Sequence, residues 1–191
     1  GDVTEAIARG RELVALIRRE RFANWQSFAL ANLSAALTAA GQLDEALQLA
    51  QEALPLLRQQ GSIWSFLDHL GLLALKRGRP FDAAQVLGCA DEFNRRSGYV
   101  RQFNEQRARD QLLEALRASV KPDELARLMK EGARLTADEA ARRAARPDGP
   151  VLRSVSAPLQ GPGSSAVPGT SLGDRDEDER EPGHHEGLGV E

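Results

Sequence analysis

The sequence is poor in cysteine and in aromatic residues. Cys89 is its single cysteine, and Phe, Trp and Tyr together make up 5% of its 191 residues. One cysteine excludes an intramolecular disulfide, and no apolar run reaches the roughly 18 to 20 residues that a membrane span needs. The shortage of aromatic residues disfavours a β-sandwich, whereas abundant alanine and leucine are typical of packed helices. We therefore expect a soluble, cytoplasmic, all-α protein without a membrane partner.

The net charge of −3 is unevenly distributed along the chain. Residues 1–146 carry a net charge of +3, and residues 147–191 carry −6. Proline, glycine and serine are frequent from Pro147 onward, and an acidic run follows at 174–179. Such a segment buries too little apolar surface to offset its ordering entropy. We predict a folded domain over 1–146 and a disordered acidic tail over 147–191, in which His184 and His185 are too few to form a structural zinc site.

An internal repeat is the most informative pattern in the sequence. A shift of 37 positions superimposes two segments, each of which indicates a helix, a turn ending in glycine, and a second helix rich in small residues. The period predicts a solenoid of helical hairpins with a short helical cap at its C-terminal end. The matching pairs are Leu30 with Leu67, Leu33 with Leu70, Ser34 with Gly71, Gly41 with Gly78, Ala46 with Ala83, and Ala53 with Ala90.

A shift of 40 positions reveals a third, partial copy in residues 1–20. This copy contains only the second helix of a hairpin, so we expect its apolar residues Ile7, Leu13, Val14 and Ile17 to be poorly covered. Terminal repeats need polar capping faces, which favours a chain truncated at its N-terminus. The alternative is that residues 1–20 form a genuine terminal helix that caps the array.

Helix signals place about seven helices and no strand. In the predicted helix 44–58, Pro55 removes a backbone hydrogen bond and predicts a bend or an early end. Ser62 is predicted to cap the next helix, and Pro80 suits the first turn of the helix after it. Further helices are expected at 100–118 and 122–131, and a capping box at 136–139 begins a last short helix that ends before Pro147.

Residues 1–96 resemble the tetratricopeptide repeat family in their pattern of small and large residues. The period departs from the usual 34, and the Trp, Tyr and Pro signature residues are missing, which indicates a divergent member. The matching positions are Leu30, Leu33, Leu37, Gly41, Ala46, Ala50 and Ala53, and again Leu67, Leu70, Gly71, Ala74, Gly78, Ala83, Leu87 and Ala90.

A narrower resemblance covers residues 62–145. The stretches 64–72, 83–91 and 131–136, with Gly98, resemble the helical C-terminal region of large bacterial signalling ATPases. In that family a nucleotide-binding switch module precedes the helices, and the same chain carries a DNA-binding, cyclase or protein-kinase output module. The resemblance implies a sensor segment whose partner is an upstream nucleotide-binding module of the same parent chain. This chain has no GxxxxGK[ST] phosphate loop, so the parent's activity does not transfer to it.

The folded region offers few groups for catalysis. His69 and Cys89 have no evident partner in a nucleophile and base pair, so we predict no enzyme and no cofactor. Asp68 and His69 are expected to be solvated or to line a groove, and Cys89 to be a small buried residue. Arginine clusters at 18–21, 95–101 and 142–146 alternate with acidic residues and are interpreted as solvated faces, without direct nucleic-acid binding.

Protein or peptide binding is the function that a helical-hairpin array favours. Its concave surface is formed mainly by the first helix of each pair. The alternatives are a free-standing adaptor or scaffold protein, and a surface that only packs against absent repeats. The repeat register assigns the candidate partner groove to Phe28, Ala31, Ala35, Thr38, Ser65, Asp68, Leu72 and Lys76.

Overall fold

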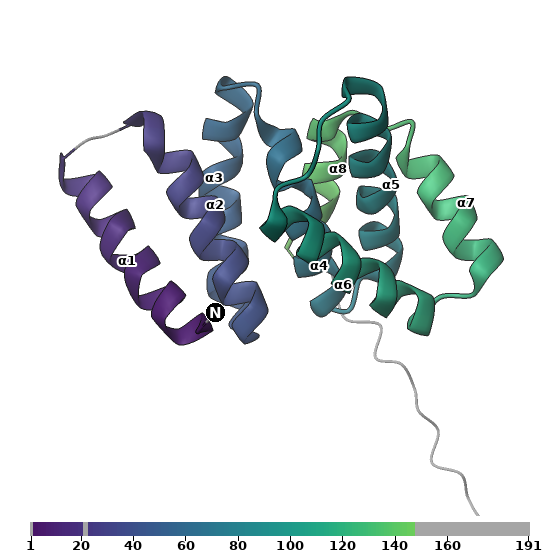
Figure 1. Ribbon diagram of the computed structural model, residues 1–191, viewed down its shortest axis with the longest axis horizontal. Coiled ribbons are helices and arrows are strands. Elements are labelled where there is room, and N and C mark those ends of the chain that lie inside the picture. The colour runs from purple at the N-terminus through teal and green to yellow at the C-terminus, as the bar shows by residue number, and fades with distance from the viewer. Residues whose placement is uncertain (1, 21–22, 148–191) are drawn as a thin grey trace, which may run out of the picture. The chain divides into compact units, whose positions relative to one another are not determined.

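The computed structural model describes residues 2–20 and 23–147, and within these ranges the chain is all-helical (Figure 1). The expected all-α class is confirmed, with one helix more than the seven predicted. The predicted tail lies outside the described residues except for Pro147. The elements are α1 (Val3–Glu20), α2 (Ala23–Ala40), α3 (Leu43–Gln59), the 3₁₀-helix η1 (Ile63–Phe66), α4 (Leu67–Lys76), α5 (Pro80–Ser97), α6 (Phe103–Ser119), α7 (Pro122–Gly132) and α8 (Ala137–Ala144).

The two copies of the 37-residue repeat form two pairs of packed helices, α2 with α3 and α4 with α5. Gly41 and Gly78 end the first helix of each pair with φ angles of +79° and +76°, a left-handed conformation that glycine adopts without strain. The amide after each glycine donates to a carbonyl five residues earlier, Gln42 to Leu37 and Arg79 to Ala74. Both turns are therefore Schellman motifs, and the predicted equivalence of these positions is confirmed locally.

The first helix is better covered than the sequence predicts. Ile7, Val14 and Ile17 are buried, and α1 packs against α2. The expectation that they would be left exposed is wrong, because α2 covers this side of α1; Leu13 is the exception, with 47% of its surface exposed. Ion pairs from Arg11 to Glu45 and from Arg18 to Glu52 connect α1 to α3 at 2.7 and 2.6 Å.

Two glycines bring α5 and α7 into backbone contact. A Cβ atom added at Gly88 would lie 2.1 Å from the Met129 carbonyl oxygen, and one added at Gly132 would lie 1.9 Å from the Gln85 carbonyl oxygen. No side chain larger than hydrogen fits at either position without moving the helices apart. The packing of α7 on α5 therefore depends on these two residues.

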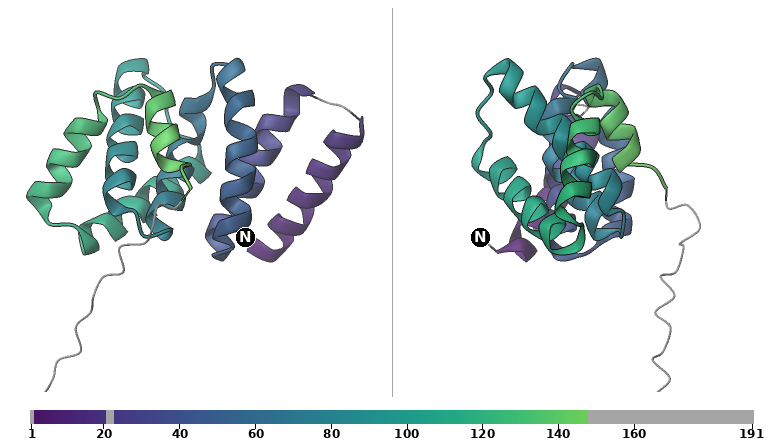
Figure 2. Two further views of the ribbon diagram at one scale, coloured as in Figure 1. Left: turned by 180° about the vertical axis from the view of Figure 1, so that it is seen from behind. Right: turned by 90° about the vertical axis from the view of Figure 1, so that its right-hand side faces the viewer.

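The last helix, α8, packs against α4 and α5 (Figure 2). Its capping box is confirmed, since the Thr136 hydroxyl accepts from the Glu139 amide and the Glu139 carboxylate accepts from the Thr136 amide. Arg58 of α3 donates to Asp138 at 2.6 Å, and Arg146 donates to Asp82 of α5 at 2.7 Å. These contacts fix the C-terminal helix across both helix pairs.

Two local predictions are wrong or modified. Helix α3 continues four residues beyond Pro55, so the proline does not end it early. Ser62 makes no capping hydrogen bond with its side chain, and the segment that follows is η1 rather than a regular α-helix. Pro80 lies at the start of α5, as predicted.

Candidate functional site

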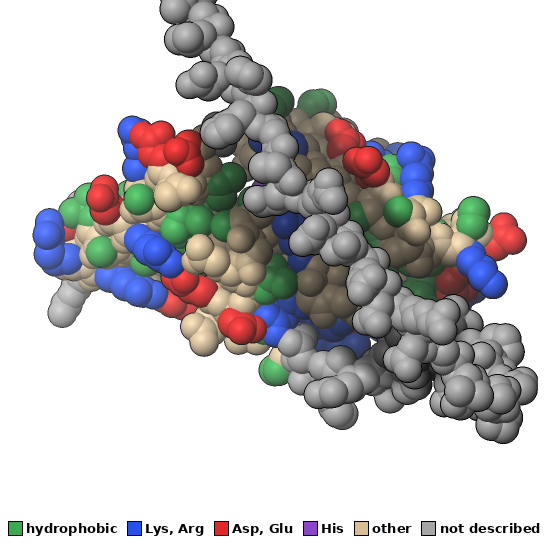
Figure 3. All heavy atoms as spheres, turned by 90° about the horizontal axis from the view of Figure 1, so that it is seen from below, with side chains coloured by type: hydrophobic (Ala, Val, Ile, Leu, Met, Phe, Trp, Pro, Cys, Tyr) green, Lys and Arg blue, Asp and Glu red, His purple; other side chains and the backbone are tan. Residues whose placement is uncertain are grey.

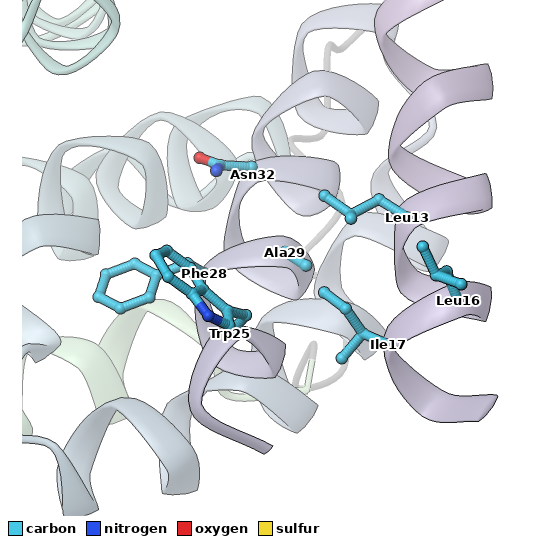
Figure 4. A pocket seen from close by; sticks show the side chains of 7 residues that line it. All are labelled: Leu13, Leu16, Ile17, Trp25, Phe28, Ala29 and Asn32. Carbon is cyan, nitrogen blue, oxygen red and sulfur yellow. The ribbon is translucent and has the colours of Figure 1, made fainter. Parts of the chain in front are cut away.

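Three adjoining hollows lie over α1, α2, α4 and α6, and we call them together the partner groove. The first, of about 460 Å³, lies between α1 and α2 and is lined by Leu13, Leu16, Ile17, Trp25, Phe28, Ala29 and Asn32 (Figure 4). The second, of about 220 Å³, is lined by residues of α2, η1, α4 and α6 and of the segments before η1 and before α6. The third, of about 330 Å³, is lined by residues of α1, α2, α4 and α6.

Five of the eight predicted groove residues line these hollows. Phe28, Ala31 and Ser65 line the second hollow, and Ala35 and Leu72 line the third. They come from α2, η1 and α4, the elements that the repeat register identifies as the first helices of the two pairs. The structure therefore brings these five residues to one surface.

The other three predicted residues are placed differently. Thr38 is buried, with its hydroxyl bonded to the Ser34 carbonyl at 2.8 Å. Asp68 is buried and paired with Arg101, so the expectation that it would be solvated or line a groove is wrong. The exposed Lys76 donates to the Ala39 carbonyl at 3.4 Å and is not among the lining residues of the three hollows.

The centre of the groove is formed by residues that the repeat analysis does not select. Asn32 lines all three hollows, and His69 and Asn104 line both the second and the third. Asn32 follows Phe28 by one helical turn on α2, a spacing that identifies it as a neighbour on the same face. Asn104 lies on α6, beyond the repeat, and no periodicity in the sequence points to it.

His69 is the most unusual group in the groove. Its Nε2 atom is buried without a hydrogen-bond partner among the described residues. Burial lowers the pKa of His69 to about 4, so the imidazole is neutral at pH 7 and has one donor and one acceptor nitrogen. A buried polar atom without a partner is rare in folded proteins, and here it belongs to a residue that lines two hollows.

An aromatic cluster fixes the wall of the groove where α6 begins. Trp64 stacks on Phe93 with ring centroids 5.2 Å apart and meets the edge of Tyr99 at 4.6 Å. The Tyr99 hydroxyl donates to Glu105 at 3.0 Å, and the backbone amide of Gln102 donates to the same carboxylate at 2.8 Å. The segment between α5 and α6 is thereby held against η1.

A buried ion network, partly exposed at Asp91 and Arg109, holds α6 beside α4 and α5. Arg101 donates to Asp68 at 2.7 Å and to Asp91 at 2.6 Å, and Arg109 donates to Asp91 at 2.9 Å. Burial raises the pKa of Asp68 above its ordinary value although Arg101 acts in the opposite direction. The network explains why Asp68 does not face the groove: its carboxylate positions the wall formed by α6.

Cys89 lies away from the partner groove and has the surroundings of a structural thiol. It is buried, and its Sγ atom lies 3.4 Å from the Leu135 carbonyl oxygen. Burial and the Glu139 carboxylate raise the pKa of Cys89 to about 11, which keeps the thiol protonated. Among residues 2–20 and 23–147, no group of three His, Cys, Asp or Glu side chains is placed to hold a metal ion.

Charged side chains of both signs are interspersed over the molecular face seen in Figure 3. None of the helices in the described part of the chain is long and apolar enough to cross a bilayer. No protein-family model matches the sequence, and no curated protein and no solved structure matches it either.

Proposed function

We propose that this chain is a non-catalytic module that binds a protein or peptide segment in the partner groove. The observation that carries the proposal is that five residues selected by the repeat register line adjoining hollows that meet at Asn32, His69 and Asn104. The first hollow adds an exposed apolar surface, in which Trp25 is 68% exposed and Phe28 41%. Exposed apolar surface of this kind is typical of interaction sites.

We further propose that the helix pairs are units of a divergent tetratricopeptide-like solenoid, with α6 to α8 as its cap. The matched glycine turns and the equal burial of Leu30 with Leu67 and of Ala46 with Ala83 support this interpretation. In a solenoid, neighbouring first helices form a continuous binding surface, which agrees with the position of the partner groove.

A regulatory role follows from the resemblance to signalling ATPases. In that role the chain is the sensor segment of a larger bacterial protein, and an occupant of the groove biases the state of a nucleotide-binding module. The coding sequence upstream of Gly1 tests this part. An in-frame phosphate loop supports the sensor, whereas a start codon close to Gly1 supports an adaptor.

Selection of peptides on the immobilised full chain tests binding in the groove. Peptides enriched from a random display library are synthesised and titrated against the wild type and Asn32→Arg, which places a long charged side chain where the three hollows meet. Asn32 is exposed, so we expect the variant to fold and to lose at least about tenfold in affinity, or about 1.4 kcal/mol.

Gln48→Arg is the matched control, because Gln48 is exposed on α3 and is not a lining residue of the three hollows. Equal binding by the wild type and Asn32→Arg, or the absence of any enriched peptide, contradicts the proposal. Asp68→Ala is unsuitable as a binding test, since it removes a buried ion-pair partner and changes stability.

A further inference from the structure

The partner groove contains polar side chains that have no hydrogen-bond partner in the described part of the chain. The buried His69 Nε2 atom has no partner among the described residues. Asn32 and Asn104 are exposed, and their side-chain amides form no hydrogen bond with a described residue. Because buried polar groups are nearly always paired, an occupant toward which the His69 ring turns its Nε2 atom removes an unfavourable feature of the free protein.

These groups favour an extended main chain over a helix as the occupant. A helix satisfies its amides and carbonyls internally, so it has little to offer the side chains at the centre of the groove. An extended segment exposes one donor and one acceptor at each residue. Asparagine amides and a neutral imidazole also present both kinds of group, and they match such a segment.

Arg107 is the one cation among the lining residues of the three hollows, and it favours an acidic group on the occupant, although Asp2 and Glu105 also line the groove. Glu105 is engaged by Tyr99 and by the Gln102 amide, and Asp2 accepts from the Thr4 amide at 2.8 Å. Arg107 lines the third hollow, is exposed on α6, and has no ion pair or hydrogen bond with a described residue. Its guanidinium is therefore free to receive a carboxylate.

The extent of the groove along α2 sets a spacing on the occupant. Phe28 lines the first hollow and Ala36 the third, and they lie eight residues apart on α2. Eight residues span about 12 Å along an α-helix. An extended chain covers that distance in about four residues.

We propose that the groove binds an extended peptide whose single large apolar side chain enters the first hollow and whose acidic side chain, about four residues away, pairs with Arg107. This inference rests on the proposed binding function and specifies the partner. The main chain between the two side chains lies over Asn32, His69 and Asn104.

The test uses a short synthetic peptide of glycine, serine and alanine, acetylated and amidated at its ends. It carries one phenylalanine and, four positions later, one glutamate. Titration is followed by the fluorescence of the protein, in which Trp25 lines the first hollow and Trp64 the second. We expect about tenfold weaker binding when Arg107 is changed to Gln or the peptide glutamate to glutamine.

The two changes together are expected to weaken binding no more than either alone, because both remove the same ion pair. A peptide methylated at the nitrogens between the two side chains is expected to bind about tenfold more weakly than the unmethylated peptide. Gln48→Arg is expected to leave binding unchanged. The inference is overturned if Arg107→Gln binds the peptide as tightly as the wild type does. It is also overturned if the methylated peptide binds as tightly as the unmethylated one. If selected peptides depend on Asn32 but are helical or basic and the designed peptide does not bind, the inference fails and the proposed function stands. If no peptide of either origin binds, both fail.

Discussion

The region α1–α3 and the region α4–α8 use different interactions to hold their helices together. In the first region the ion pairs lie at the surface, and the Arg18 and Glu52 side chains are 49% and 39% exposed. In the second, Arg101 and Asp68 are 11% and 6% exposed. A surface pair contributes little to stability, whereas a buried pair is costly to break. The second region is therefore the one whose structure depends on particular charged residues.

The regions also differ in how closely their helices approach. Gly10 of α1 faces the flexible side chain of Leu33, with an added Cβ at 2.9 Å from its Cδ1 atom. Gly88 of α5 faces the backbone of α7. A side chain can change its rotamer, but a helix backbone moves only as a whole. The partner groove lies where the surface of α1 and α2, in the more adaptable region, meets the wall formed by α6.

The largest difference between the regions is expected from removing one arginine in each. Arg101→Met leaves the buried Asp68 carboxylate without its partner and is expected to lower the free energy of unfolding by about 3 to 5 kcal/mol. Arg18→Met removes a surface pair and is expected to change it by less than about 1 kcal/mol. Urea unfolding followed by circular dichroism at pH 7 measures both. Equal losses would remove the distinction between the regions.

The pH dependence of Arg101→Met identifies the cause of its loss. Burial already raises the pKa of Asp68, and removal of Arg101 raises it further. A carboxyl group whose pKa is raised in the folded state destabilises that state as the pH rises above the pKa that the group has in the unfolded chain. The variant should therefore lose less stability near pH 4 than at pH 7, and Asp68→Asn should restore part of the loss at pH 7.

A second comparison substitutes one glycine in each region. Gly88→Ala forces α5 and α7 apart and is expected to cost about 2 to 3 kcal/mol. Gly10→Ala meets only the end of a leucine side chain, and alanine favours a helix over glycine by about 1 kcal/mol, so little net change is expected. Urea unfolding of both variants and of the wild type measures these changes in the free energy of unfolding. A loss in Gly10→Ala as large as that in Gly88→Ala would show that both regions are equally rigid.

His69 lines the groove where the two regions meet, and it predicts a pH effect. Its folded-state pKa of about 4 lies below the ordinary 6.5, so the unfolded state binds the proton first as pH falls. The stability that the neutral imidazole contributes is present above pH 6.5 and is lost as pH falls toward 4. Between pH 7 and pH 4.5 we expect the wild type to lose on the order of 2 kcal/mol more than His69→Gln. Parallel pH profiles would contradict the burial of His69.

The repeated part of the fold follows directly from the sequence. Leu30 with Leu67 and Gly41 with Gly78 report packing and turn geometry that are local to a helical hairpin, so a sequence shift detects them. The position of α7 does not, because it depends on the contact of Gly88 with Met129, far apart in the sequence. Small residues at such positions are visible in the sequence, but their partners are not.

The candidate site was predictable only on the side formed by the repeat. Phe28, Ala31 and Leu72 follow from the helical register, which assigns a face to each residue. Asp68 has the same register but is buried, because it pairs with Arg101. Arg101 lies in a segment without periodicity, so the sequence does not indicate this pair. Asn104 and Arg107 also line the groove. They lie on α6, a helix outside the repeat, so the repeat register does not identify them.

The smallest expected effect compares how often each region opens. Cys89 is buried in α5, and Ala53 is a buried small residue of α3. In a Cys89→Ala background, Ala53→Cys places a single thiol in the first region, and each thiol reacts with an alkylating reagent only when its surroundings open. The region with fewer buried ion pairs and looser helix contacts should open more often. We expect Ala53→Cys to react about tenfold faster than Cys89 in the folded protein at pH 8, a difference of about 1.4 kcal/mol in opening free energy.

Rates measured in urea give the intrinsic reactivity of each thiol as the control. If Cys89 reacts as fast as Ala53→Cys after this correction, the buried ion network does not make α4–α8 the more rigid region, and the wall of the groove is as adaptable as its α1–α2 side.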